Sequence, residues 1–533
     1  MFKKILLILI SITIVFNYVN AYKILSVVPH FGGSHVKFMG KVADILVRGG
    51  HDVTCLMIPI EPGLTMVGTK LAKVIHVEKN NRTFELVEKF FKTSNVWEND
   101  IGKILTARSI INNMVLASKT NCKHIIKNHT LIEFLKNEKF DLAITQHIDY
   151  CAFGLFKLLN IPAHVSLFAG GLMPSHFKRF GLTFPLAQLP DLNLAANDKE
   201  MTFFNKIKNI FSYTLMEMFN NNMIAGTEEV FNEEIEEGFV DIKQQLRDAV
   251  FHISNSDPYV DLAYPTLSKI VQIGGFSIPK PNLLNKEWDS LLSKRKKNIL
   301  ISFGSIAKSI MMPQDFKKGL IEAIKQFPDV TFIWKYENPE DGFAKDVDNI
   351  YLSKWVPQTD LLNDPRLSGF MTHGGLNSLS ESAHYGMPLI VVPLFGDQPR
   401  NARIAEKLGL GKMVSKHNLK NPEIIKESIE ILLDDNNVLK QKAQIIKEMI
   451  INRPYNQTDV FVKHIEFAAK FKKLPNLNME GHDMSIFQYA LIDVILFLGF
   501  IVMLILLVIF YGLYRLYKFI VNKLCTKKKD KKE

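Results

Sequence analysis

Residues 370–398, FMTHGGLNSLSESAHYGMPLIVVPLFGDQ, carry the most informative pattern in the chain. An apolar run ends at Thr372, two glycines follow, and apolar residues then recur at helical spacing over residues 376–385. A second apolar run covers residues 389–392, and Asp397-Gln398 comes soon after it. This order predicts a strand–helix–strand unit, with a ligand at the ends of the strands and the first turn of the helix.

Similar units occur earlier in the chain, in two series. The first series begins with a short apolar strand at residues 23–28 and a helix that is opened by Gly32-Gly33 and ended by Gly49-Gly50. The second series begins after a polar stretch rich in proline, glycine and lysine. Alternating strands and helices in two series predict an α/β fold of two Rossmann-like domains that face a cleft. The further elements expected are strands at 51–58, 140–145, 298–303, 329–334 and 370–372, and helices at 151–159, 315–326, 400–408 and 422–450.

The two ends of the chain carry apolar segments of different lengths. Residues 1–21 have a charged start, a short apolar run and a small-residue end, which is typical of a cleaved signal peptide. Residues 494–514 are uncharged and long enough to cross a bilayer as a helix. The expected order is therefore signal peptide 1–21, N-terminal domain 22–275, linker 276–296, C-terminal domain 297–480, transmembrane helix 494–514 and lysine-rich tail 515–533.

Charge and sequons indicate the compartment. The basic residues that follow residue 514 predict a cytoplasmic tail and a luminal body, that is, a single-pass type I protein that also contacts membrane lipid. Lys529 and Lys531 lie at positions of a dilysine retrieval signal, which favours the endoplasmic reticulum. Sequons agree with a luminal, glycosylated body and occur at Asn81, Asn128 and Asn456.

Several classes of protein and site are disfavoured by composition. Much of the net charge of +11 lies in the tail, and no basic stripe with interleaved aromatic residues occurs in the body, so no nucleic-acid partner is expected. The sequence has no CxxC motif and no histidine cluster, so no metal site is expected. Three cysteines precede the transmembrane segment, at positions 55, 122 and 151, and this odd number predicts no disulfide framework.

The residues around the glycine pair suit a nucleotide sugar. Backbone N–H groups at the start of a helix, together with its dipole, favour a diphosphate, and His373 can hydrogen-bond to it. The carboxylate of Glu381 can accept hydrogen bonds from ribose hydroxyls, and Trp355 offers a flat face for a nucleobase. Asp397 and Gln398 can bond to the hydroxyls of a sugar.

Taken together, residues 355–398 closely resemble the donor-binding signature of the UDP-glycosyltransferase family, the animal group that includes UDP-glucuronosyltransferases. The resemblance extends to nearly the whole chain, from signal peptide to lysine-rich tail, and it implies an acceptor-binding domain at 22–275 and a UDP-sugar-binding domain at 297–480. It implies a metal-independent, inverting transferase of the GT-B fold that needs no cofactor, since the UDP-sugar is a co-substrate. It also implies donor contacts for uracil (Trp355 and Gln358), diphosphate (Ser305, His373, Gly375, Asn377 and Ser378), ribose (Glu381) and sugar (Asp397 and Gln398).

The same resemblance assigns the general base to His35, in the motif Gly33-Ser34-His35 after the first strand. An imidazole is suited to taking a proton from a hydroxyl group at neutral pH. Family members orient this histidine with an acidic residue near the end of a later strand, where this chain has Gln146. We expect Asp149, three residues further on, to be the partner of His35, with Gln146 as the alternative.

Several points stay open at the level of sequence. The donor is UDP-glucuronic acid by family default or UDP-glucose, and Arg400 and Arg403 are the candidates to bind a glucuronate carboxylate. The acceptor is a small lipophilic molecule, and residues 172–222, rich in phenylalanine and methionine, are core packing, an acceptor pocket or a surface that rests on the membrane. The alternative to an active transferase is a weakly active or inactive protein that binds lipophiles and UDP-sugars. Homo- or hetero-oligomers are not excluded.

Overall fold

The computed structural model describes residues 21–93, 96–98, 104–191, 201–434, 436 and 438–529. Apart from Ala21, the expected signal peptide lies outside these residues. The chain divides into two compact units, Met1–Asn478 and Met479–Glu533. The first unit contains both sheets, and the second contains the apolar C-terminal helix.

The N-terminal half of the first unit is built on a parallel sheet. Among the described residues it has seven strands in the order β3-β2-β1-β4-β5-β6-β7. Their bounds are β1 Lys23–His30, β2 Asp52–Pro59, β3 Lys73–His76, β4 Leu142–Gln146, β5 His164–Phe168, β6 His252–Ser254 and β7 Ile270–Gln272. The helices of this half are α2 Gly33–Arg48, α3 Asn81–Thr93, α4 Ile104–Ile126, α5 His129–Asn137, α6 Cys151–Leu158, α7 Pro174–Arg179, α8 Phe203–Glu234 and α9 Ile242–Asp248.

The C-terminal half repeats this architecture. Its sheet, counted over the described residues, has six parallel strands in the order β10-β9-β8-β11-β12-β13. The strands are β8 Lys297–Ser302, β9 Val330–Lys335, β10 Ile350–Ser353, β11 Leu367–Thr372, β12 Leu389–Val391 and β13 Gly411–Met413. The helices are α10 Lys286–Ser293, α11 Gln314–Ile324, α12 Gln358–Asn363, α13 Leu376–Tyr385, α14 Gln398–Leu408, α15 Pro422–Leu433, α16 Val438–Ile451 and α17 Gln457–Phe471.

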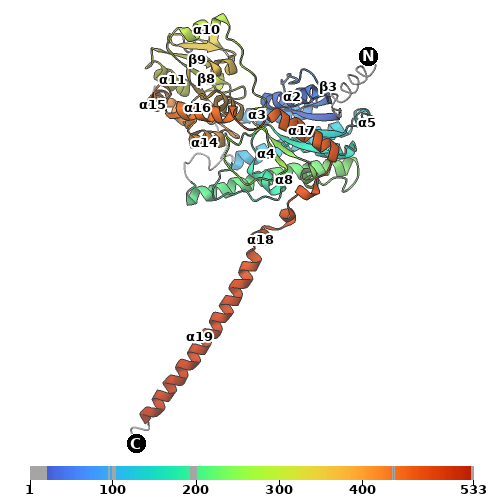
Figure 1. Ribbon diagram of the computed structural model, residues 1–533, viewed down its shortest axis with the longest axis vertical. Coiled ribbons are helices and arrows are strands. Elements are labelled where there is room, and N and C mark those ends of the chain that lie inside the picture. Colours follow the sequence, from blue (N-terminus) through green and yellow to red (C-terminus); the bar gives the residue numbers. More distant parts are fainter. Residues whose placement is uncertain are drawn as a thin grey trace, which may run out of the picture. The chain divides into compact units, whose positions relative to one another are not determined.

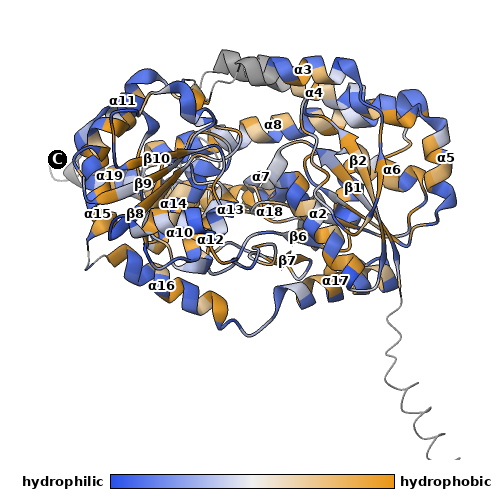
Figure 2. Cartoon of the chain, turned by 90° about the horizontal axis from the view of Figure 1, so that it is seen from above, coloured by the Kyte–Doolittle hydropathy of each residue, from blue (hydrophilic) through white to orange (hydrophobic). Residues whose placement is uncertain are grey.

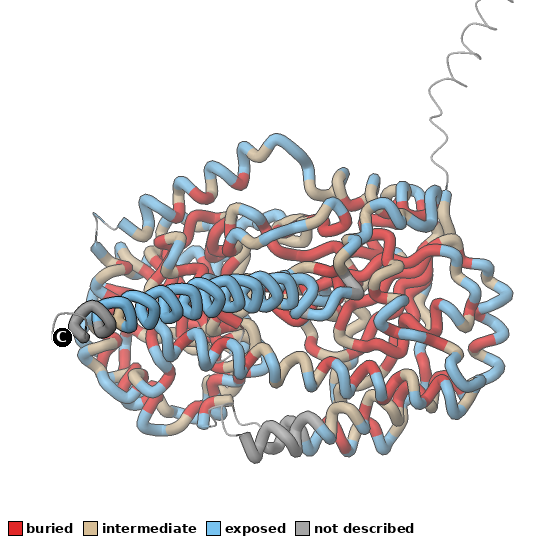
Figure 3. Tube along the Cα trace, turned by 90° about the horizontal axis from the view of Figure 1, so that it is seen from below, coloured by how far each residue is buried: buried red, intermediate tan, exposed pale blue. Residues whose placement is uncertain are grey.

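Both sheets form the centre of the apolar core. In β1 and β2 the burial pattern is nearly continuous, and β9 is buried along its whole length. Figure 2 shows β1, β2 and β9 as apolar, with helices around them, and Figure 3 shows that the buried residues lie in the interior of both halves. A parallel sheet covered on both faces needs such unbroken apolar runs, because neither face meets water. The expected fold of two Rossmann-like domains is confirmed.

One helix from the end of the first unit, α17, packs against the N-terminal half. Helix α17 lies in the stretch expected to belong to the C-terminal domain, yet Phe461 and Ile465 are fully buried among residues of β1, α2 and β5. In Figure 1 this helix lies beside α2. The N-terminal sheet is therefore covered on one face partly by residues from the end of the first unit.

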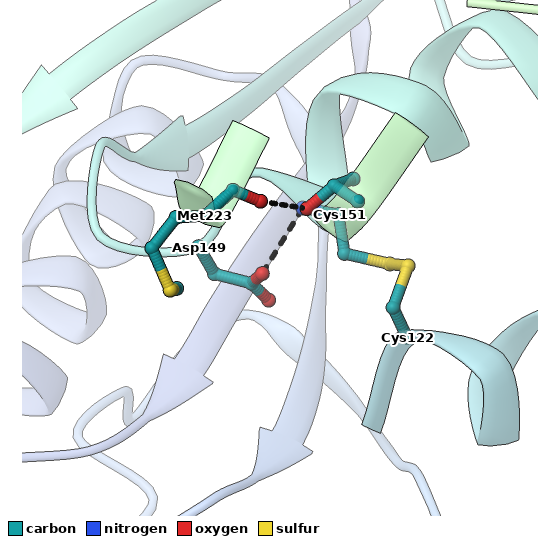
Figure 4. Close-up of a disulfide and its surroundings, with 5 residues drawn as sticks. Cys122, Asp149, Cys151 and Met223 are labelled. Atoms are coloured by element: carbon teal, nitrogen blue, oxygen red, sulfur yellow. Dashed lines mark hydrogen bonds between the residues drawn. A yellow bond between two sulfur atoms is a disulfide. The ribbon is translucent and has the colours of Figure 1, made fainter. Parts of the chain in front are cut away.

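The cysteines differ from expectation. Cys122 of α4 and Cys151 of α6 form a disulfide, and Cys55 is buried as a free thiol (Figure 4). The expectation of no disulfide framework is wrong for this pair. An odd count leaves one cysteine over but does not prevent the other two from pairing, and their distance in the fold could not be read from a separation of 29 residues.

The aromatic stretch at residues 172–222 divides into two parts. Phe177, Phe180 and Phe184 are buried in a core cluster that joins both halves. Phe203 and Phe204, in the first turn of α8, are instead 71% and 72% exposed. Core packing therefore explains the first part of the stretch, and it does not explain the second.

The second unit consists mainly of α18 Ile486–Tyr489 and α19 Ile492–Lys529. Within the described residues, one helix is long and apolar enough to cross a membrane, over Ile492–Leu524, and its side chains are exposed along its length (Figure 3). The expected segment 494–514 lies inside it. An apolar helix without protein packing is what a lipid environment would accommodate.

Candidate active site

The expected site residues follow the carboxyl ends of strands in both halves. His35 lies in the first turn of α2, after β1, and Gln146 is the last residue of β4. The donor residues follow strands of the second sheet: Ser305 after β8, Trp355 and Gln358 after β10, the 373–381 group after β11, and Asp397-Gln398 after β12. This is the end of a parallel sheet where ligands bind in doubly wound folds.

His35 and Gln146 are joined by two hydrogen bonds. The ring Nδ1 of His35 lies 2.6 Å from Gln146 Oε1, and Gln146 Nε2 donates to the backbone carbonyl of His35 at 3.0 Å. Gly32 makes room for the ring, because a Cβ at that position would lie 3.0 Å from the His35 ring, and its φ of 68° also favours glycine. The imidazole is thereby held in one position at the start of α2.

This pair also fixes the tautomer of His35. A carbonyl oxygen only accepts hydrogen bonds, so the Gln146 atom that faces the His35 carbonyl must be the amide nitrogen. The amide oxygen then faces Nδ1, which must carry a proton in order to donate to it. The other ring nitrogen, Nε2, is left with a lone pair, as a general base requires.

Asp149 does not occupy the position expected for it. Its Oδ1 accepts a hydrogen bond from the backbone N–H of Cys151 at 3.0 Å, at the start of α6 (Figure 4). Burial raises the pKa of the Asp149 carboxyl to about 6. The hydrogen-bond partner of His35 is therefore Gln146, which corrects the expectation that Asp149 orients the ring; the turn after β4 directs the Asp149 carboxylate to the α6 backbone.

The residues assigned to the nucleoside form one group. Gln358 Nε2 donates to Glu381 Oε2 at 2.8 Å and lies 3.5 Å from Ser378 Oγ. Burial raises the pKa of Glu381, and the Gln358 hydrogen bond and the charge of Lys37 oppose this rise. Trp355 is 66% exposed, so one face of its indole is open to a base. Expected uracil and ribose contacts thus lie together, although their roles stay predictions.

His373 is held between two glycines. A Cβ on Gly304 would lie 2.8 Å from the His373 ring, and one on Gly375 would lie 2.7 Å from it. Burial, together with the charge of Lys335, lowers the pKa of His373 to about 4, so the ring is neutral at pH 7. A neutral His373 can donate a hydrogen bond to a diphosphate without adding charge. Ser305 and Asn377, also assigned to the diphosphate, are exposed.

Asp397 and Gln398 are anchored at the start of α14. Gln398 Oε1 accepts from the backbone N–H groups of Leu394 and Phe395, which leaves its amide N–H₂ for a ligand. Asn401 donates to Asp397 Oδ2 and to the carbonyl of Gly374. Asn401 therefore connects the residues assigned to the sugar with the glycine pair.

Two lysines near these residues were not expected in a binding role, and a third cation, Arg400, makes a contact other than the expected one. Lys37, two residues after His35, has its Nζ 5.4 Å from the ring centre of Trp355. Lys335 Nζ donates to the carbonyl of Gly304 at 3.0 Å. Arg400, a candidate for a glucuronate carboxylate, instead pairs with Asp261 of the N-terminal half at 2.6 Å. Sequence gives no signal for the contacts of Lys37 and Arg400, because both depend on how the two halves face one another. The Lys335 contact lies within the second sheet, between the end of β9 and the turn after β8.

Known proteins agree with this geometry. The profile of the family described as "UDP-glucoronosyl and UDP-glucosyl transferase" matches residues 23–531. The chain is 27% identical to the Caenorhabditis elegans protein named "Putative UDP-glucuronosyltransferase ugt-50", over 90% of this chain and 92% of that one. It is also 27% identical to human UDP-glucuronosyltransferase 1A3, over 89% and 87% of the two chains. A solved structure of Phytolacca americana UGT2, complexed with UDP-2fluoro-glucose and pterostilbene, shares the fold with a TM-score of 0.54 at 14% identity, covering 84% of this chain and all of that one.

Proposed function

The chain belongs to the UDP-glucuronosyl and UDP-glucosyl transferase family, and we propose that it transfers a hexosyl group, with inversion, from a UDP-sugar to a hydroxyl of a small lipophilic acceptor. The observation that carries this proposal is the hydrogen-bonded pair of His35 and Gln146 in the half that faces the donor residues. It supplies a base with a free Nε2 beside a site suited to a nucleotide sugar.

The proposed step is a single displacement. His35 Nε2 takes the proton of the acceptor hydroxyl, and the acceptor oxygen forms a bond to C1 of the sugar. The bond from C1 to the β-phosphate oxygen breaks, and UDP leaves with the electron pair. The neutral His373 and the N–H groups at the start of α13 would stabilise the negative charge that grows on the diphosphate.

Gln146 stabilises the positively charged form of His35 less than an acidic residue would. When His35 accepts the proton, its ring becomes positive, and the amide oxygen of Gln146 stabilises that charge by one hydrogen bond. A carboxylate in the same place would add a full negative charge and stabilise the imidazolium more strongly. This feature favours the second candidate function, a protein that binds lipophiles and UDP-sugars with weak or no transfer.

The choice of donor sugar is open between two classes. The name of the human relative specifies glucuronosyl transfer, and the solved plant relative holds a UDP-glucose analogue. Either donor is compatible with the residues around Trp355 and Glu381, since those residues face the nucleoside. We propose no metal ion or other cofactor for the reaction.

Membrane placement is part of the same proposal. The candidate span Ile492–Leu524 is followed by a lysine-rich tail, and the distribution of positive charge favours a cytoplasmic tail and a luminal body. Lys529 and Lys531 favour retention in the endoplasmic reticulum. A single-pass type I arrangement would keep the site close to lipophilic acceptors that dissolve in the membrane.

The test is an assay of microsomes that contain the full chain. Radiolabelled UDP-glucose and UDP-glucuronic acid are offered with a panel of phenols and sterols, with and without EDTA. We expect a labelled conjugate from at least one donor, unaffected by EDTA and absent with His35→Ala. If UDP binds by calorimetry but no donor gives a conjugate, the transferase proposal is wrong and the binding-protein alternative replaces it.

A further inference from the structure

Two buried ion pairs join the N-terminal half to the C-terminal half. Arg400 Nη2 donates to Asp261 Oδ1 at 2.6 Å, and Arg453 Nη2 donates to Asp257 Oδ2 at 2.8 Å. The four side chains are 7% exposed or less. Both aspartates lie in the segment between β6 and β7, and each reaches an arginine of the other half. Both are arginine–aspartate ion pairs, and they differ in the residues that surround them.

The Arg400–Asp261 pair lies next to the residues assigned to the sugar. Arg400 is in the first turn of α14, three residues after Asp397. Burial raises the pKa of Asp397, and the hydrogen bond from Asn401 and the proximity of His35 and Arg400 oppose this rise. His35 itself is on α2 of the N-terminal half. The base, the sugar-binding carboxylate and Arg400 therefore act on one another electrostatically, although they come from both halves.

The charge of Arg400 is already neutralised by Asp261 at this place. Asp261 Oδ1 accepts both the Arg400 guanidinium and the N–H of Leu262, while among the described residues nothing donates to Asp261 Oδ2, which is buried. One arginine is thus matched by one aspartate, and Asp397 adds a further carboxyl group. A carboxylate on the donor sugar would meet no unengaged Arg400 here, and it would be repelled by Asp261.

We infer that Asp261 is a donor-specificity residue that, by engaging Arg400, selects an uncharged hexose over a hexuronate. This inference rests on the proposed function and names the substrate class of the same site. Specificity arises as much from repulsion of the wrong donor as from attraction of the right one. The expected donor is UDP-glucose or another neutral UDP-hexose, and Arg400 serves to hold Asp261 rather than to bind a carboxylate.

The experiment measures the ratio of kcat/KM for UDP-glucose to that for UDP-glucuronic acid, with one phenol acceptor and the full chain in microsomes. The ratio does not depend on the amount of folded protein. We expect the wild type to favour UDP-glucose by about tenfold or more. Asp261→Asn should shift the ratio toward UDP-glucuronic acid by about tenfold, because Arg400 then carries an uncompensated charge.

Two further variants separate this effect from general disruption. Asp257→Asn breaks the other interdomain pair and should leave the donor ratio unchanged. Arg400→Gln added to Asp261→Asn should abolish the gain in glucuronate use. A wild type that prefers UDP-glucuronic acid, together with selective loss of that donor in Arg400→Gln, would overturn the inference.

The outcome is also distinct from failure of the proposed function. If neither donor is transferred, calorimetry with UDP-glucose and UDP-glucuronic acid still gives a ratio of affinities. If the wild type binds UDP-glucose more tightly than UDP-glucuronic acid and Asp261→Asn reduces this preference, Asp261 determines donor specificity in a protein that binds UDP-sugars without transferring them. Equal affinities in all variants would contradict it.

Discussion

Lys37 Nζ lies 5.4 Å from the ring centre of Trp355, so a cation of the N-terminal half rests on the indole that is assigned to the nucleobase. Such cation–π contacts contribute about 0.5–1 kcal/mol at exposed sites. A base that stacks on the same face would displace Lys37, whose positive charge also acts on Glu381 and would stay beside an anionic nucleotide.

Lys37→Gln should therefore weaken UDP-sugar binding by about threefold to tenfold. The substitution removes an electrostatic attraction of about 1 kcal/mol between the ammonium and the negatively charged ligand. The loss should shrink as salt is raised, since exposed charges are screened. Titration calorimetry at low and high salt measures this, with Lys41→Gln, one turn further along α2, as the control. Tighter binding in Lys37→Gln would show that Lys37 only obstructs the base.

The role of Gln146 predicts an ordered series of rates. His35→Ala should reduce kcat by a factor on the order of 10²–10⁴ with UDP affinity intact. Gln146→Ala should reduce kcat less, because the base remains but loses its fixed tautomer. Gln146→Glu should raise kcat and move the acidic limb of the pH–rate profile to higher pH, since a carboxylate favours the protonated ring. A slower Gln146→Glu enzyme with an unmoved profile would contradict this reading.

The two glycines around His373 predict a steric effect on donor binding. Gly375→Ala should weaken UDP affinity by about tenfold, because a Cβ 2.7 Å from the ring forces His373 out of place. Gly375 has a negative φ of −59°, so backbone strain does not explain such a loss. Gly170→Ala, where nothing lies within 4 Å of the added Cβ, is the matched control. UDP binding by Gly375→Ala at wild-type strength would remove His373 from the diphosphate site.

Asp149 predicts a dependence of stability on pH. Its folded pKa of about 6 lies above the value of 3.8 for an unperturbed aspartate, so the folded state holds the proton more tightly. The stability of the wild type relative to Asp149→Asn should therefore fall as pH rises from about 3 to about 7, by about 3 kcal/mol in total, with most of the loss between pH 4 and pH 6. Thermal unfolding of both proteins in detergent at several pH values measures the difference. A constant difference over this range would be inconsistent with a protonated, buried Asp149.

The proposed topology predicts glycans on the body and protease access to the tail. Asn81 and Asn456 are exposed, and Asn128 and Asn456 cap α5 and α17 through their side-chain oxygens, which leaves each amide nitrogen available. Enzymatic removal of N-glycans should increase gel mobility for the wild type and not for the triple Asn→Gln variant. In sealed microsomes, protease should remove an epitope placed after Lys529. Protection of that epitope would reverse the orientation.

Sequence predicted the fold well because its signals are local. Within β1–α2, and again within β11–α13, the glycines and apolar runs that define each element are close together in the sequence. The local pattern alone is therefore enough to predict these elements. The residues assigned to the donor could be selected for the same reason, since all of them except Ser305 follow strand ends within the continuous segment 355–398. Contacts between segments gave no such signal. The Cys122–Cys151 disulfide, the pairing of Arg400 with Asp261 and the choice of Gln146 over Asp149 each depend on a turn or an interface.

Helix α17 has a consequence for how the protein folds during synthesis. The apolar face that receives Phe461 and Ile465 belongs to β1, α2 and β5, which leave the ribosome long before α17 does. That face stays uncovered until the whole C-terminal half has been made, and exposed apolar surface of this kind is what chaperones bind and what aggregates. A fragment cut at the linker would keep the same face open permanently. The N-terminal half therefore cannot complete its folding before the C-terminal half has been synthesised, although it comes first in the sequence.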